Sequence, residues 1–236
     1  MNERHKRLER IFDGWAASYG RSPKEEGLFV GYRRSLEGAA ALARVSAGMR
    51  VLDVGIGTGA LAEKLAARGA QIWGIDISSR MLERCREHHP EFRLQSGHFL
   101  EIPFADGLFD RVVSSFAFHH LMPGEYRRAF TEVLRVMVPG GRFVIADIMF
   151  ASDEERQAAR DRLAAWWDEE EVYPFVPCVT AAAWEAGTAG VESHRLGWLH
   201  WAVTGSKPDA EGQREGGPGE ATMRNPRAEG AGSGRR

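Results

Sequence analysis

The stretch VLDVGIGTGA, residues 51–60 of this 236-residue chain, decides the fold. Its opening apolar residues predict a short buried strand, and Gly55, Gly57 and Gly59 predict a sharp turn directly after it. Glycines permit positive φ and let the backbone approach a ligand closely. A helix that begins at Ala60 would point free N–H groups at the turn. The stretch therefore predicts a strand, a ligand-binding turn and a helix.

Strand-like and helix-like segments alternate on both sides of this stretch. Strands are expected at residues 49–54, 71–75, 92–94, 111–115 and 143–146, with two more around Gly197. Helices are expected at residues 60–68, after Ser78, at 124–136, from Ser152 to about Glu171, and from Thr180, with a turn at 139–141. This alternation predicts an α/β fold: a Rossmann-like, doubly wound, mostly parallel seven-stranded sheet with helices on both faces. Ligands of such sheets bind beyond the carboxyl ends of the strands.

Composition divides the chain into three regions. Residues 1–48 predict an N-terminal helical cap that is rich in aromatic residues, among them Trp15, Tyr19 and Tyr32. Residues 49–204 form the ligand-binding domain, and residues 205–236 are expected to be a disordered tail. The tail contains almost no large apolar residue, so it cannot bury enough surface to offset the entropy of ordering.

Charge and cysteine content limit the kind of partner. The formal net charge is -2 and both signs are mixed along the chain, so we expect no nucleic-acid partner. Cys85 and Cys178 have neither a disulfide pattern nor a zinc-ligand spacing, so no metal site is expected. No apolar signal or membrane-spanning segment is visible, which favours a cytoplasmic protein away from the membrane. The sequence leaves the oligomeric state open.

Asp76 indicates that the ligand contains adenosine. It ends the second predicted strand, where a carboxylate can accept hydrogen bonds from both hydroxyls of a ribose. The glycine turn fits two patterns, because G-x-G-x-x-A is typical of dinucleotide sites and D-x-G-x-G-x-G is typical of S-adenosylmethionine (AdoMet) sites. These residues alone allow a nicotinamide-dependent oxidoreductase as well as an AdoMet-binding protein.

Five stretches in a fixed order favour AdoMet. They are VLDVGIGTG at 51–59, GIDIS at 74–78, SGHFLEIPF at 96–104, FDRVVSSFAFHHL at 109–121 and VPGGRFVIAD at 138–147. Over about residues 10–204 the chain resembles class I AdoMet-dependent methyltransferases, and IFDGWAASYG at 11–20 resembles the cap helix of members that act on small molecules. SSFAFHHL and EEEVYPFVP are most similar to the YrrT-like group of bacterial methyltransferases. The resemblance implies a methyltransferase domain at 49–204 that transfers a methyl group from AdoMet to a small-molecule acceptor.

The resemblance also implies which residues bind AdoMet. Each of them lies at the end of a predicted strand, follows one, or lies in the cap: Tyr19, Asp53, Gly55, Gly57, Gly59, Asp76, Ile77, His98, Phe99 and Ser114. Asp53 would support the loop and face the methionine amino group, and Asp76 would hold the ribose. His98 departs from the family, which usually has an aspartate there to accept from the adenine amino group. A neutral histidine has one acceptor and one donor nitrogen, so His98 can accept in one tautomer only. This departure keeps a non-catalytic AdoMet-binding protein as an alternative.

His119 and His120 are the candidate catalytic residues. They come directly after the fourth predicted strand, and a histidine near its ordinary pKa can remove a proton from an acceptor at neutral pH. Of the two we expect His119 to act as the base, and a purely structural role for the pair is the alternative. The acidic run at 168–171 is interpreted as a solvated helix end.

Overall fold

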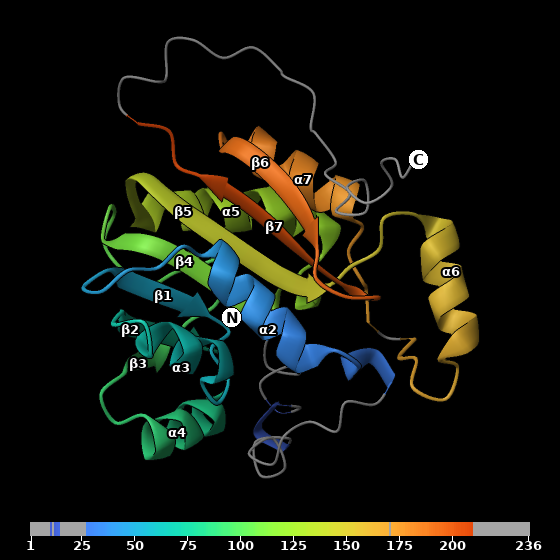
Figure 1. Cartoon of the computed structure of the whole chain (residues 1–236), viewed down its shortest axis with the longest axis horizontal. Coiled ribbons are helices and arrows are strands. Elements are labelled where there is room, and N and C mark those ends of the chain that lie inside the picture. The colour runs from blue at the N-terminus through green and yellow to red at the C-terminus, as the bar shows by residue number, and fades with distance from the viewer. Residues whose placement is uncertain (1–9, 11, 15–26, 170, 210–236) are drawn as a thin grey trace, which may run out of the picture.

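The computed structural model describes residues 10, 12–14, 27–169 and 171–209 (Figure 1). The expectations for Trp15, Tyr19 and the tail from residue 210 onward lie outside these ranges. A seven-stranded sheet forms the centre, in the order β3-β2-β1-β4-β5-β7-β6. The strands are β1 (Arg50–Val54), β2 (Gln71–Asp76), β3 (Arg93–Ser96), β4 (Phe109–Ser115), β5 (Met137–Ile148), β6 (Ala189–Arg195) and β7 (His200–Ser206). Strands β1 to β5 are parallel, and β7 runs antiparallel to both β5 and β6, which confirms the predicted sheet.

Helices cover both faces of the sheet, as Figure 1 shows. One face packs against α2 (Tyr32–Leu42), α3 (Ala60–Ala66) and α4 (Ser79–His88). The other face packs against α5 (Tyr126–Val136) and α7 (Val176–Glu185). Helix α6 (Asp153–Arg162) lies to one side, beyond the end of β5 (Figure 1). Three short 3-10 turns complete the described chain: η1 (Gly27–Phe29), η2 (Phe118–His120) and η3 (Pro123–Glu125).

Local side chains set the helix starts as predicted. The Ser78 hydroxyl accepts a hydrogen bond from the Met81 N–H at 3.1 Å and caps α4. The Ser152 hydroxyl accepts from the Glu155 N–H at 3.3 Å and caps α6. The Glu155 carboxylate in turn accepts from the Ala151 N–H, one residue before the position that a capping box uses.

The expected end of α6 near residue 171 is wrong, because the helix stops at Arg162. The side chain of Trp167 packs against Phe150 and Tyr173, with ring centroids 6.0 and 4.9 Å apart. Tertiary packing of this aromatic group therefore overrides the helical propensity of the segment. As a result, Glu171 lies on a connecting segment and not at a helix end.

Other boundaries also differ from the expectation. The predicted turn at 139–141 lies inside β5, where the register against β4 shifts and Gly140 has φ of 71°. Helix α7 begins at Val176 rather than Thr180. Strand β7 continues past residue 204 to Ser206. None of these changes alters the strand order.

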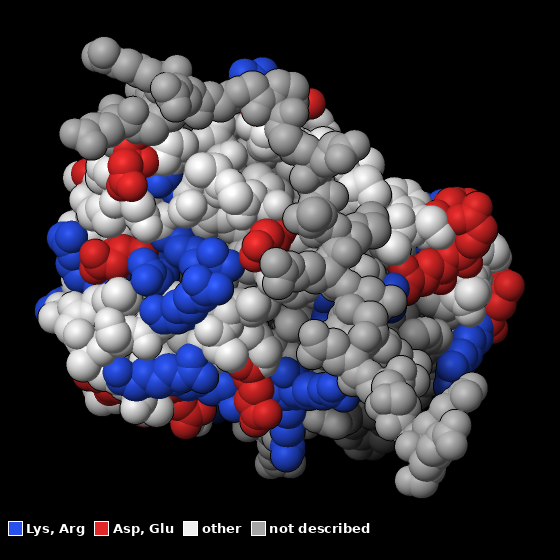
Figure 2. Space-filling view, turned by 45° about the horizontal axis from the view of Figure 1, so that its top comes forward, with Lys and Arg blue, Asp and Glu red and all other residues white. Residues whose placement is uncertain are grey.

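Figure 2 shows side chains of both charges on one face: basic ones gather at the left and lower part of the view, with a few acidic ones among them, and an acidic group lies at the right. Two arginines have a clear structural role: Arg111 donates to the carbonyl of Ala43, and Arg142 donates to that of Leu42. Cations at these carbonyls stabilise the carboxyl end of α2. Among the described helices, none has the length and apolar character needed to cross a bilayer.

Candidate active site

The site lies where the strand order reverses, between β1 and β4. Val54 is followed by the glycine loop, whose Gly55 and Ile56 N–H groups both donate to the Ile75 carbonyl at 2.8 and 3.0 Å. Gly55 has φ of 74°, and a methyl group added to it would lie 2.4 Å from Cβ of Ala117. Only glycine lets the two loops approach this closely. This loop is the turn that the strand, turn and helix pattern predicts.

Asp76, at the end of the neighbouring strand β2, supports the glycine loop through hydrogen bonds. Its Oδ2 accepts from the Gly57 N–H and its Oδ1 from the Ser78 N–H, both at 2.9 Å. The side chain is buried, and burial raises the pKa of Asp76 to about 6, although these two hydrogen bonds oppose the shift. At neutral pH the carboxylate is mainly ionised and borders the cavity.

Asp53 lies beneath the glycine loop. It is 1% exposed, and neither carboxylate oxygen reaches a hydrogen bond of normal geometry with the described residues, although the Ala62 N–H is near. Burial, followed by the charge of Asp76, raises the pKa of Asp53 to about 8. Two buried carboxyl groups close together are unfavourable alone and become favourable beside a cationic ligand.

A cavity that is partly open to solvent extends from Asp76 along the glycine loop. Seven of the expected site residues line it: Gly55, Gly57, Asp76, Ile77, His98, Phe99 and His120. Four others are not among its lining residues: Asp53, Gly59, Ser114 and His119. Tyr19 lies outside the described residues.

Several wall residues were not assigned to the cofactor from the sequence. Ser115 rather than Ser114 reaches the cavity, as do Phe12, Met81 and Phe116. Phe116 has φ of 54°, a conformation that costs energy outside glycine and is common at functional sites. Its ring lies 4.9 Å from that of Tyr32, a cap residue expected at the wall and found there. The aromatic content of FAFHH was a signal for these contacts.

The N-terminal segment contacts both ends of the cavity. The Ser78 hydroxyl donates to Asp13 Oδ1 at 2.6 Å, next to Asp76. The ring of Phe12 packs edge-on against His120, with centroids 4.8 Å apart. The segment thus joins the two sides of the cavity.

The tautomer of His98 follows from its neighbour. Its Nδ1 accepts from the Leu100 N–H at 3.2 Å, so in the neutral ring the proton is on Nε2. A ring in this form presents a donor at Nε2 and cannot accept there from an amino group. The expected acceptance from the adenine amino group would need the other tautomer, so the role of His98 in binding stays a prediction.

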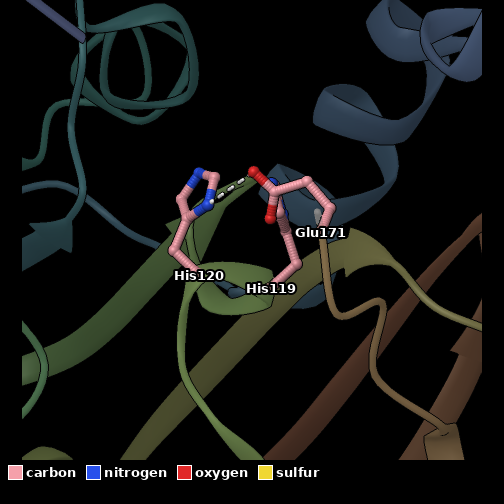
Figure 3. Close-up of side chains that lie close together, drawn as sticks. All are labelled: His119, His120 and Glu171. Carbon is pink, nitrogen blue, oxygen red and sulfur yellow. Dashed lines mark ion pairs between the residues drawn. The ribbon is translucent and has the colours of Figure 1, made fainter. Parts of the chain in front are cut away.

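A second group of polar side chains lies at the mouth of the cavity. His119 Nδ1 lies 2.7 Å from Asp147 Oδ1, and the His119 N–H donates to Asp147 Oδ2 at 3.0 Å. His120 Nδ1 lies 3.4 Å from Glu171 Oε1, as Figure 3 shows. The interpretation of Glu171 as part of a solvated helix end is therefore wrong. Parallel strands bring His119 and Asp147 together, since Ser115 of β4 pairs with Ala146 of β5.

Burial and charge separate the two histidines. Burial lowers the pKa of His119, but the Asp147 carboxylate outweighs it, so the pKa lies above its ordinary value. Burial and the neighbouring His119 hold the pKa of His120 below its ordinary value. His120 is thus neutral at pH 7 and faces the cavity, whereas His119 is hydrogen-bonded to Asp147.

The residues present fit AdoMet better than a nicotinamide dinucleotide. AdoMet carries a sulfonium and an ammonium group, which two buried carboxyls attract, whereas a dinucleotide would bring two negative phosphates to the same place. The unpartnered oxygens of Asp53 beneath the loop, together with the cavity lined by Gly55 and Gly57, fit an amino acid moiety. Fold and site together define an AdoMet-dependent methyltransferase.

Comparisons with known proteins support this class. Residues 51–141 match a family described as a methyltransferase domain. An uncharacterised methyltransferase of Geobacillus kaustophilus is 35% identical over 65% of this chain and 73% of its own length. One from Bacillus thuringiensis is 33% identical over 84% of this chain and 96% of its own length. The structure of Haemonchus contortus phosphoethanolamine N-methyltransferase 2, solved with AdoMet, has a TM-score of 0.66 at 17% identity, covering 89% of this chain and 61% of that one. The chain belongs to the class I AdoMet-dependent methyltransferases, and AdoMet is its methyl donor.

Proposed function

We propose that this methyltransferase acts on a small molecule that enters the mouth of the AdoMet cavity beside His120. The observation that supports this most directly is the limited access to the acceptor side. The side chains of His119 and His120 are only 11% and 13% exposed. A small acceptor can reach them, whereas an acceptor atom on a folded macromolecule would have to leave its own surface to do so.

The chain's own residues orient the cofactor. Asp76 would accept from the ribose hydroxyls, Ile77 and Phe99 would flank the adenine, and Asp53 would neutralise the methionine amino group. When bound, AdoMet supplies an electrophilic methyl group on a sulfonium. Phe12, Tyr32 and Phe116 exclude water from the apolar part of the wall, and their ring faces suit a cation.

His120 is the group best placed to hold a proton from the acceptor. It is neutral, lines the cavity, and lies beside the Glu171 carboxylate, which would stabilise the imidazolium once it forms. His119 packs against His120 with centroids 3.9 Å apart and positions it. The geometry thus favours His120 over His119 as the base.

Two measurements test the proposal. Calorimetric titration with AdoMet, its demethylated product and NAD should show micromolar binding of the first two and none of NAD, and Asp76→Ala should abolish binding. Transfer of an isotopically labelled methyl group should then label small hydroxyl, thiol, amine or carboxyl compounds from a metabolite extract. Label that appears only in the RNA or protein fraction would refute a small-molecule acceptor.

A further inference from the structure

Three donor side chains meet at the mouth of the cavity. His119, His120 and Glu171 each offer one ligand atom, and these atoms all lie within 4.8 Å of one another (Figure 3). Two imidazoles and one carboxylate are the donor set of many catalytic zinc sites and of non-haem iron(II) sites. We propose that this cluster binds one divalent transition-metal ion, such as zinc, with an open coordination position that faces the AdoMet cavity. The proposal rests on the proposed function, because the open position would receive the methyl acceptor.

Asp147 gives His119 the orientation that a metal ligand needs. In metal sites the ring nitrogen that does not bind the ion usually donates to a carboxylate, which fixes the tautomer. His119 Nδ1 lies 2.7 Å from Asp147 Oδ1, so Nε2 is the nitrogen left for an ion. Asp147 is itself held, since it accepts from the N–H groups of His119 and Ile148 at 3.0 and 2.7 Å. The carboxylate that would orient His119 toward an ion is therefore already in place.

The donor separations are close to those of a filled site. Ligand atoms about 2.1 Å from a tetrahedral ion lie about 3.4 Å apart. His120 Nδ1 and Glu171 Oε1 are already separated by 3.4 Å. No pair of ligand atoms is more than 4.8 Å apart, so the widest pair would have to close by at most about 1.4 Å, a change within the reach of side-chain rotation. The two carboxylates, Asp147 and Glu171, would balance the double charge of the ion.

The sequence could not reveal this site, and no metal was expected from it. The usual signature is a short spacing between ligands, but Glu171 lies far along the chain from the two histidines. The chain between β5 and α7 returns to the site and places Glu171 beside the two histidines. The Phe150 N–H donates to the Pro174 carbonyl at 3.1 Å, and the Val176 N–H donates to the Phe150 carbonyl at 2.9 Å.

The ion would narrow the class of acceptor to a hydroxyl or thiol compound. A divalent metal lowers the pKa of a group bound to it. The acceptor would release its proton to solvent on binding, and its lone pair would then form the bond to the methyl carbon. The electrons of the broken carbon–sulfur bond would return to the sulfur, so no oxidant or reductant is needed. In the metal-free protein, His120 would take the proton instead.

Zinc titration tests the site directly. The experiment uses Zn²⁺ alone, in competition with a chromophoric chelator, on the full chain carrying Cys178→Ser, because that exposed thiol is another zinc donor. One ion should bind per chain. Asp147→Asn should weaken binding roughly 10- to 100-fold, as expected for an outer-shell partner. Glu171→Gln and His120→Gln should weaken it further.

His194→Gln is the matched control. His194 Nε2 lies 3.4 Å from Glu192 Oε2, the same separation as in the His120–Glu171 pair. This pair has no third donor of the kind a metal needs within the described chain. Zinc affinity should be unchanged in this variant.

Two outcomes would overturn the metal site. One is the absence of stoichiometric zinc binding in the parent protein, and the other is unchanged affinity in both Glu171→Gln and His120→Gln. AdoMet titration and the urea midpoint of Glu171→Gln show whether that variant is folded, since Glu171 does not line the AdoMet cavity. Loss of zinc binding with AdoMet binding intact removes only the metal site. Zinc binding without AdoMet binding would instead contradict the proposed function.

Discussion

Replacement of Asp53 by asparagine should remove a pH dependence from the stability of the cofactor-free protein. Asp53 is 1% exposed, and burial raises its pKa from 3.8 to about 8. Between these two values the folded chain binds the proton and the unfolded chain does not. The free energy of unfolding therefore falls as the pH rises through this window.

The size of the effect follows from the proton difference. One group contributes up to about 1.4 kcal/mol per pH unit. The wild-type protein should thus lose about 3 kcal/mol of stability through Asp53 between about pH 5 and about pH 7. Asparagine is neutral throughout, so Asp53→Asn should lack this loss. Asp76 and His119, whose pKa values are also raised, give slopes of the same sign in both proteins, and the comparison cancels these slopes.

Urea unfolding of wild type and variant at the two pH values measures the difference. Asp161→Asn, at an exposed position on α6, serves as the control and should behave as wild type. If wild type and Asp53→Asn respond to pH within about 0.5 kcal/mol of each other, Asp53 is already ionised in the folded protein. The reasoning from burial would then be wrong.

Three further changes have distinct expected outcomes. AdoMet affinity should fall as the pH is lowered through about 6, because protonation of Asp76 removes an acceptor for the ribose hydroxyls. Calorimetry of wild type and Asp76→Asn checks this, and the variant should bind AdoMet at least about tenfold more weakly at every pH. Gly55→Ala should lose both stability and AdoMet binding. Gly48 has φ of 84° and nothing within 4 Å of an added methyl group, so Gly48→Ala should lose only the backbone cost of about 1–2 kcal/mol in urea unfolding. Thr188→Val should leave the stability unchanged or raise it by up to about 1 kcal/mol, since the buried Thr188 hydroxyl has no partner in the described chain. Thr204→Val should lower the stability, because the Thr204 hydroxyl accepts a hydrogen bond from Arg142 at 2.8 Å. Equal effects of either matched pair would contradict the structural explanation.

The sequence predicted the fold well because its signals are local. Gly55 directly follows β1, and β2, β3 and β4 end in aspartate or serine. Ser78 and Ser152 mark helix starts through hydrogen bonds to residues three positions away. The glycine loop and Asp76 could be placed together for the same reason: parallel strands end at one edge of the sheet.

Long-range packing produced the parts of the site that the sequence did not show. The contact between His120 and Glu171 depends on where α6 stops, and that end depends on the packing of Trp167 against Tyr173. The tautomer of His98 depends on the backbone N–H of Leu100. No periodic pattern encodes such contacts, because each is set by a segment distant in sequence or by one backbone conformation.

The N-terminal contacts described above have a kinetic consequence. The Asp13–Ser78 hydrogen bond and the Phe12–His120 ring contact join the adenosine side of the cavity to the acceptor side. We expect weaker contacts to speed the release of the demethylated product, because the two contacts lie on opposite sides of the cavity that the product would leave. Stronger contacts should slow the exchange of product for fresh AdoMet.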